Sequence, residues 1–154
     1  MSTNTSRLYD TDYGLWLASQ INSIRSHHWD ELDIDNLIEE LEGLNRSNEH
    51  ALESYLIVIL THLLKWQYQP LARSGSWKGS IRNGRQRIAK LFKQQPSLKP
   101  RVPELLPEAY TEAIEVAIDE TGLSNVFPDQ CPYSADQVLD VEFLPVSDYE
   151  DLVP

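Results

Sequence analysis

Apolar residues recur every three or four positions through most of this chain, which is the spacing of amphipathic α-helices. A first helix is predicted to begin at Asp10 or Thr11, since either side chain can cap an N-terminus, and to continue to about Ser26. One face of this helix is expected to be buried. Its members are Tyr13, Trp16, Leu17, Ile21 and Ile24.

The longest apolar stripe begins near Asp33 or Asp35 and ends before Pro70. Its steps of three or four residues cross positions 43–48 without losing phase, so we predict one helix of about 34 residues. A bend within that stretch stays open, because Gly, Asn and Ser are poor helix formers. The stripe consists of Leu37, Leu41, Leu44, Asn48, Ala51 or Leu52, Tyr55, Ile59, His62 and Trp66.

Two further helices follow, one from Ser74 or Ser76 to about Gln94 and one from Pro103 to Thr121, with Gly122 suited to a left-handed C-terminal cap. A turn or two of helix is predicted at 134–139. Together these elements predict an all-α bundle of about four main helices with one long central helix and a partly ordered acidic C-terminal tail. We expect a single domain over residues 8–145, with residues 1–7 and 146–154 disordered or frayed.

Charge changes this picture, because acidic and basic residues are segregated along the chain. No Asp or Glu occurs between Ser54 and Pro103, and that stretch holds ten of the 13 Lys and Arg. Residues 1–53 carry three basic and 11 acidic side chains, and residues 104–154 carry 13 acidic and no basic ones. Either the acidic flanks fold onto the basic middle, or the middle meets an external anion.

Composition restricts the class of protein. The 154 residues, 41% of them apolar, suit one soluble domain, and the single cysteine, Cys131, excludes an intrachain disulfide. No apolar run approaches the length of a membrane span, and the first residues lack the features of a signal peptide. We therefore expect a cytoplasmic protein without a membrane partner.

The connector after Pro70 and the helix behind it form the candidate site for an anion or a nucleic acid. Aromatic rings interleaved with arginines suit single-stranded nucleic acid, because bases stack on the rings and guanidinium groups hold phosphates. The alternative is internal ion pairing, in which Arg85 leans over the core face and needs a carboxylate from the second or fourth helix. The candidate residues are Trp66, Arg73, Ser76, Trp77, Lys78, Arg82 and Arg85.

His62 is the one histidine on the long apolar stripe. It could serve as a metal ligand or general base together with glutamates, but in a continuous helix Glu42 lies about 30 Å away from it. The favoured interpretation is a structural histidine hydrogen-bonded in the core. No metal site and no cofactor is predicted.

Several short motifs resemble one known family. They include Leu8-Tyr9 with Asp12 and Trp16, the segment from His62 to Pro70 followed by 73–77, and Cys131-Pro-Tyr133. With these motifs the chain resembles a bacterial, often cyanobacterial, family called domain of unknown function number 29. The resemblance implies an all-helical domain in a bacterial cytoplasm and supplies no catalytic residues. Gly84, inside a predicted helix, is the one position where a stronger helix former was expected.

These observations favour a non-enzymatic interaction or regulatory domain of unknown specific function. The first alternative is a nucleic-acid-associated protein that uses the region from Trp66 to Arg85. The second is a metal-assisted hydrolase built around His62. A homodimer is also predicted, because a helix this long must cover part of its apolar stripe with other helices or a second copy. The partners could equally be another protein or single-stranded nucleic acid.

Overall fold

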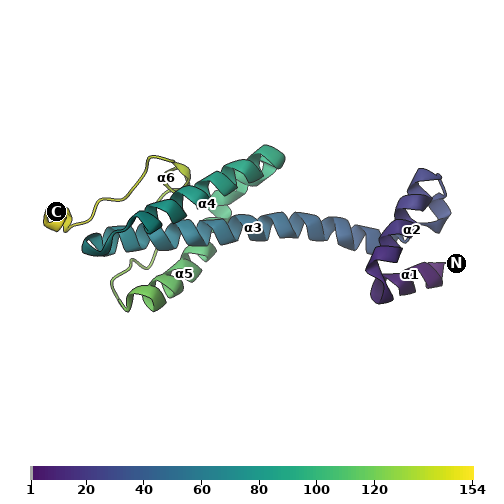
Figure 1. The fold of residues 1–154 in the computed structure, drawn as a ribbon, viewed down its shortest axis with the longest axis horizontal. Coiled ribbons are helices and arrows are strands. Elements are labelled where there is room, and N and C mark those ends of the chain that lie inside the picture. Colours follow the sequence, from purple (N-terminus) through teal and green to yellow (C-terminus); the bar gives the residue numbers. More distant parts are fainter. Residues whose placement is uncertain (1) are drawn as a thin grey trace. The chain divides into compact units, whose positions relative to one another are not determined.

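The computed structural model describes residues 2–154, with side chains from Asn4 onward, and these residues form helices and connecting segments without a strand (Figure 1). The all-α class and the long central helix are therefore confirmed. The α-helices are α1 (Ser2–Thr11), α2 (Tyr13–Arg25), α3 (Ile34–Tyr68), α4 (Gly75–Gln94), α5 (Val102–Thr121) and α6 (Ala135–Leu139). Short 3₁₀ helices lie at Trp29–Glu31, Pro70–Ala72, Pro96–Arg101 and Glu150–Leu152.

Contacts divide the chain into two compact units, an N-terminal unit that ends at Ser47 and a C-terminal unit that begins at Asn48. The α3 helix contributes to both. The expectation of a single domain over 8–145 with frayed ends stays a prediction, and Met1 lies outside the described residues.

The N-terminal unit begins with a helix that the apolar periodicity did not predict. The α1 sequence is rich in Ser, Thr and Asn, which are poor helix formers. Tertiary contacts hold it instead, since the Tyr9 ring meets Trp16 edge-on at a centroid distance of 4.8 Å. Asp12, rather than Asp10 or Thr11, caps α2 by accepting the Leu15 N–H at 3.0 Å.

The interior of the N-terminal unit is small and partly polar. Its buried side chains among the described residues are Trp16, Gln20 and Ser23. The Trp16 indole donates to the Asp33 carboxylate at 2.9 Å, and the Gln20 amide oxygen accepts the Asp33 N–H at 2.8 Å. The prediction of a fully buried α2 face is wrong for Tyr13, Ile21 and Ile24, which stay exposed. The reason is that α2 contacts the start of α3 through the polar groups of Trp16, Gln20 and Asp33. The neighbouring apolar positions of α2 stay uncovered.

The C-terminal unit has a larger apolar core, and Figure 1 shows α4 and α5 running beside the second part of α3. Its buried residues come from all four helices of the unit and from the segment that joins α4 to α5. They include Leu56 and Leu60 on α3, Ile81 and Ile88 on α4, Leu106 and Ala113 on α5, Val138 on α6, and Leu98.

The buried stripe of α3 is shifted from its predicted position. Leu52, Leu56, Ile59 and Leu63 are fully buried, whereas His62 is only partly buried at the edge of the stripe. Periodicity alone did not decide between the two phases, because positions 55–64 are so rich in apolar side chains that both fit.

Gly84 marks the closest approach of α4 to α3. A Cβ atom added there would lie 2.7 Å from Cγ1 of Ile59, which is too close for two carbon atoms. The position that looked unsuited to a helix is therefore the one where only glycine lets the two helices pack at this distance.

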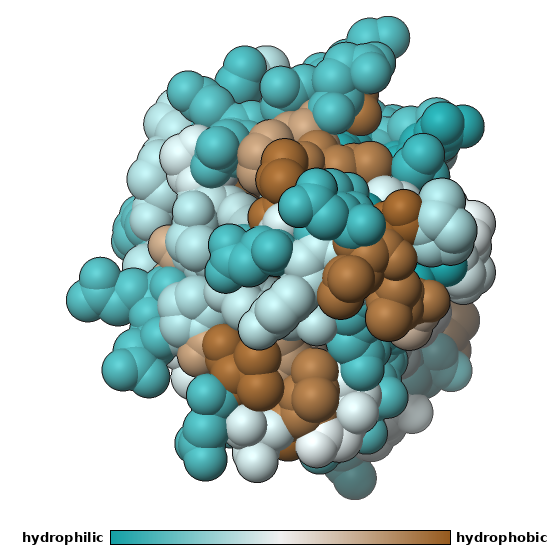
Figure 2. All heavy atoms as spheres, turned by 90° about the vertical axis from the view of Figure 1, so that its left-hand side faces the viewer, coloured by the Kyte–Doolittle hydropathy of each residue, from teal (hydrophilic) through white to brown (hydrophobic). Residues whose placement is uncertain are grey.

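The segment after α5 has the cap and the short helix that the sequence predicted. Gly122 closes α5 in the left-handed conformation with φ of 72°, and Ser134 and Gln137 form a capping box on α6. Beyond α6, Tyr149 and Leu152 line a cavity of about 260 Å³ with Tyr68 and Leu71. Figure 2 shows this end of the molecule, where apolar atoms gather in separate patches between hydrophilic ones.

The helices formed by residues 2–154 include none that is long and apolar enough to cross a membrane.

Candidate functional site

The predicted anion site centres on Trp66, and the structure shows that its ring already has cations beside it. The guanidinium carbon of Arg73 lies 4.6 Å from the ring centroid, and the Lys78 ammonium lies 5.5 Å from it. Arg73 also donates from Nε to the Trp66 carbonyl at 2.9 Å. These cation–π contacts leave the indole less available for stacking against a base.

The acidic tail neutralises Arg73. The two terminal nitrogens of Arg73 donate to the two carboxylate oxygens of Glu150 at 2.5 and 2.7 Å, in the bidentate geometry of a strong ion pair. The Ser147 N–H donates to the same carboxylate at 3.0 Å. Arg73 holds the pKa of Glu150 down to about 2, because hydrogen bonds and positive charge favour the ionised form.

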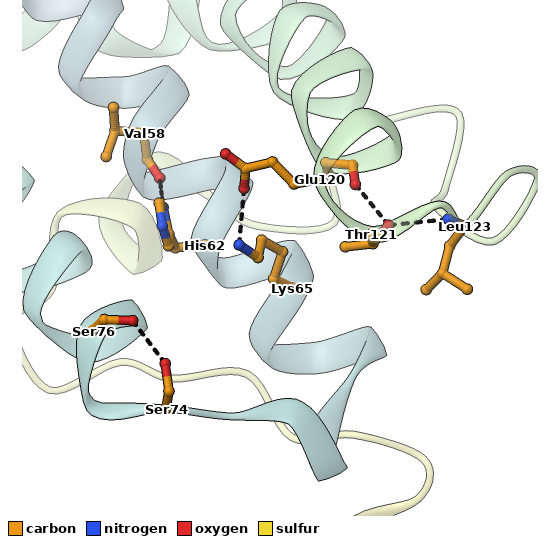
Figure 3. Close-up of polar contacts among 9 residues, drawn as sticks. Val58, His62, Lys65, Ser74, Ser76, Glu120, Thr121 and Leu123 are labelled. Atoms are coloured by element: carbon orange, nitrogen blue, oxygen red, sulfur yellow. Dashed lines mark hydrogen bonds and ion pairs between the residues drawn. The ribbon is translucent and has the colours of Figure 1, made fainter.

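Trp77 is flanked in the same way by Lys65, whose ammonium lies 4.6 Å from the ring centroid. That ammonium donates to Glu120 of α5 at 2.8 Å (Figure 3). Arg101, at the end of the basic stretch, pairs with both Glu49 and Glu104. Glutamates outside the basic stretch thus neutralise Lys65, Arg73 and Arg101, three of its ten cations, whereas neutralisation of much of the stretch was predicted.

Arg85 is buried, as its position on the core face predicted, but the prediction of a carboxylate partner is wrong. Its Nε donates to the Val138 carbonyl at 2.8 Å and its Nη2 to the Gln137 carbonyl at 3.2 Å. These carbonyls belong to the last turn of α6, where backbone acceptors lack helical partners and carry partial negative charge. Burial lowers the pKa of the Arg85 guanidinium, and nearby Asp140 opposes that shift.

Ser76 and Ser74 lie at the start of α4, where their hydroxyls contact each other at 2.8 Å (Figure 3). Ser74 is the N-cap residue by position, although its side chain makes no capping bond. Ser76, Lys78 and Arg82 are exposed. Lys78 and Arg82 also line a cavity of about 150 Å³ with Arg85 and Glu142.

Lys78 and Arg82 share the outer face of α4 with three cations that the predicted site omitted. Arg87, Lys90 and Lys93 are exposed, and α4 contains no acidic residue. None of these three nor Arg82 takes part in an ion pair within the described part of the chain. A helical projection of the sequence could have found this face, because the five cations lie opposite Ile81, Ile88 and Leu91.

His62 makes one local contact. Its Nδ1 lies 2.8 Å from the Val58 carbonyl one turn earlier, so this nitrogen carries the proton and donates (Figure 3). The predicted bond to a carbonyl is present, but the core position is not, since the ring lies at the partly exposed edge of α3. Groups of three or more metal-ligating side chains do not occur among the described residues.

Cys131 lies partly buried beside a cavity of about 470 Å³ that Tyr110, Asp129 and Tyr133 also line. Its thiol donates to the Tyr133 carbonyl at 3.3 Å. Burial raises the pKa of the Cys131 thiol, which favours the unreactive protonated form.

The N-terminal unit presents a different kind of surface. On α3 the apolar stripe that is buried from Leu52 onward continues in the N-terminal direction through Leu41, Ile38 and Ile34, all of which are exposed. On α2, Ile21 and Ile24 add to the exposed apolar side chains. The predicted stripe of the long helix contained Leu41 but neither Ile34 nor Ile38, and the α2 stripe was expected to be buried.

Comparison with known protein families gives a match over most of the chain. A family model described as Domain of unknown function DUF29 matches residues 8–144. No curated protein matches the chain, and no solved structure matches it.

Proposed function

The chain belongs to the DUF29 family, and we propose that it is a non-enzymatic interaction domain that forms a homodimer through its N-terminal unit. The observation that carries this proposal is the exposed apolar stripe of α3. Ile38, Leu41 and Leu44 expose 47%, 65% and 64% of their surface, although each is a large aliphatic residue.

The N-terminal unit buries little apolar surface of its own. We therefore attribute its exposed apolar stripe to an interface. Trp16 is its one fully buried large apolar side chain among the described residues, and its partners are polar. Small units with few buried apolar groups gain stability when an additional surface covers them. Contiguous exposed apolar side chains of this size usually mark an interface.

The spacing of the stripe fits a second copy. Ile34, Ile38 and Leu41 follow one another at steps of four and three, which is the spacing of helix pairs that pack knobs into holes. Two identical stripes can pair about a two-fold axis, the commonest symmetry of soluble oligomers. A standard interface buries ~800 Å² per partner, and seven exposed large side chains of the N-terminal unit are available to it. They are Tyr13, Ile21, Ile24, Ile34, Ile38, Leu41 and Leu44.

The other predicted functions have weaker support. His62 bonds to its own helix, and Arg73 and Arg85 are engaged within the C-terminal unit. A metal-assisted hydrolase and a nucleic-acid surface at Trp66–Arg85 both stay predictions. So do a bacterial source and a cytoplasmic location.

Sedimentation equilibrium tests the proposal. The wild type is expected at twice the chain mass of 17.7 kDa, and the double variant Ile38→Gln/Leu41→Gln at the mass of one chain. The matched control is Leu71→Gln/Val141→Gln, which changes two apolar side chains of the C-terminal unit that are more exposed than Ile38 and Leu41 and should leave the dimer intact. A wild type that stays at 17.7 kDa at every concentration would reject self-association and favour a different protein as partner.

A further inference from the structure

We infer that the outer face of α4 binds the phosphate backbone of duplex nucleic acid without reading its sequence. This face is defined by Lys78, Arg82, Arg87, Lys90 and Lys93. The inference is independent of the proposed dimer, since the dimer surface lies on the N-terminal unit.

The cations on the outer face of α4 have no acidic partner among the described residues. Lys65, Arg73 and Arg101, in the same basic stretch, all pair with glutamates. Arg82, Arg87, Lys90 and Lys93 make no ion pair in the described part of the chain, although the protein carries 24 acidic residues. Since the fold leaves these side chains unpaired, their charge is available to an external anion.

The cations on this face are spaced so that they can contact several phosphates at once. The cations extend over about 22 Å of helix axis from Lys78 to Lys93, and at about 100° per residue Arg82, Lys90 and Lys93 form a row that Lys78 and Arg87 flank on either side. Phosphates follow one another at about 3.4 Å along each strand of a duplex, so this row can face several of them at once. Glu142 is the one acidic side chain that lines the cavity beside Lys78 and Arg82, and Arg87, Lys90 and Lys93 do not line that cavity.

The small and polar side chains between these cations favour nucleic acid over an acidic protein as the ligand. The other residues on the outer face are small or polar and include Asn83, Gln86 and Ala89. A protein interface normally has an apolar core, which this face lacks. Phosphate contacts are made by Arg, Lys, Asn and Gln side chains, which this face has.

The aromatic rings near this face favour a duplex over a single strand, because cations or the core already contact them. Single-strand binding relies on exposed aromatic rings on which bases stack. The rings of Trp66 and Trp77 already have Arg73, Lys78 and Lys65 beside them, and Phe92 on α4 is partly buried in the core. The outer face of α4 therefore offers charge without stacking.

Fluorescence anisotropy with a labelled 20-base-pair duplex of mixed sequence tests the inference. We expect binding in the range of ~10⁻⁵ M at low salt, weakening steeply as salt rises, because each phosphate contact releases counterions. The triple variant Arg87→Gln/Lys90→Gln/Lys93→Gln should weaken binding at least about tenfold and reduce the salt slope by about 2 to 3.

The matched control removes three positive charges elsewhere. Arg7→Gln/Arg25→Gln/Arg46→Gln has the same net charge as the α4 triple but changes only exposed arginines of the N-terminal unit. It should bind the duplex within about threefold of the wild type, and circular dichroism should show both triples folded.

Four outcomes would overturn all or part of the inference. The first is equal weakening by both triples, which would reduce the effect to net charge. The second is no binding of the duplex by the folded wild type at 50 mM salt. The third is competition by polyglutamate as effective as by unlabelled duplex at equal charge, which would point to an acidic protein instead. A single strand that binds more tightly than the duplex would overturn the choice of duplex.

Discussion

At the scale of single residues, burial and nearby acceptors decide what each arginine does. Arg73 is nearly buried and finds a carboxylate, Arg85 is buried and finds two carbonyls, and Arg87 is exposed and finds neither. The three share a side chain and a basic stretch of sequence. Their roles differ because desolvated charge must be hydrogen-bonded, whereas exposed charge is satisfied by water.

Replacing Arg85 tests its role as a cap on α6. Arg85→Met keeps most of the side-chain volume and removes the donors to Val138 and Gln137, so two backbone acceptors lose their partner. We expect the free energy of unfolding, measured in urea, to fall by about 2–3 kcal/mol. Arg87→Met, on the exposed side of the same helix, should change it by less than about 0.5 kcal/mol. Equal effects of the two changes would contradict the capping role.

The ion pair of Arg73 with Glu150 predicts a pH dependence. The pKa of Glu150 is about 2, below its ordinary value of 4.5, so the ionised form is favoured in the folded protein. A lowered carboxyl pKa stabilises the fold above the unfolded pKa, and this contribution is lost as pH falls through the folded pKa. The stability difference between the wild type and Glu150→Gln should be constant from pH 5 to 7 and disappear between about pH 4.5 and 2.

The carboxyl carbon shift of Glu150, followed by NMR, gives the titration directly. A midpoint near 4.5 in the wild type would mean that the ion pair does not form in solution. In Arg73→Gln the midpoint should return towards that ordinary value, because the hydrogen bonds and positive charge of Arg73 are the main cause of the shift.

At the scale of elements, the contact between α3 and α4 depends on one glycine. Gly84→Ala adds a methyl group 2.7 Å from Cγ1 of Ile59, which is fully buried and cannot move freely. Overpacking of this kind costs about 1–3 kcal/mol and outweighs the gain of about 1 kcal/mol in helix propensity. Thermal and urea unfolding should both show a destabilised protein.

Gly79 provides the control for this change. It lies in α4 as well, but a Cβ atom there would meet nothing within 4 Å, so Gly79→Ala should stabilise the protein by about 0.5–1 kcal/mol. In a double-mutant cycle, Gly84→Ala should cost less when Ile59 is also changed to Ala, because the clash is then removed. Additive effects at the two positions would show that Ile59 is not the obstacle.

At the scale of the whole molecule, segregated charge predicts that the proposed dimer and the proposed contact with a nucleic-acid duplex respond to salt in opposite directions. Residues 1–47 carry nine acidic and three basic side chains, so pairing two N-terminal units brings like charges together. Salt screens that repulsion. We expect the dimer to tighten between 50 and 300 mM NaCl in sedimentation experiments. Dissociation on adding salt would instead indicate that attraction between opposite charges holds the two copies together.

Much of the architecture could be predicted from the sequence because it depends on near neighbours in the chain. The length of α3, the left-handed cap at Gly122 and the short helix after Ser134 all follow from spacing, turn chemistry and capping residues. The family match could also be anticipated, because its motifs are local. The α1 helix was missed, since its residues have little helix propensity and its support comes from Trp16 and Glu40.

Only the tertiary structure decided which of the two possible phases of α3 is buried, which acceptors Arg85 uses, and which cations stay unpaired. Each depends on groups far apart in the sequence, such as Val138 for Arg85 and Glu150 for Arg73. Local pattern ranks a position as apolar or charged, but it does not say what will lie opposite it. The apolar stripe of α3 shows the difference, because the same spacing is fully buried at Leu56 and 65% exposed at Leu41.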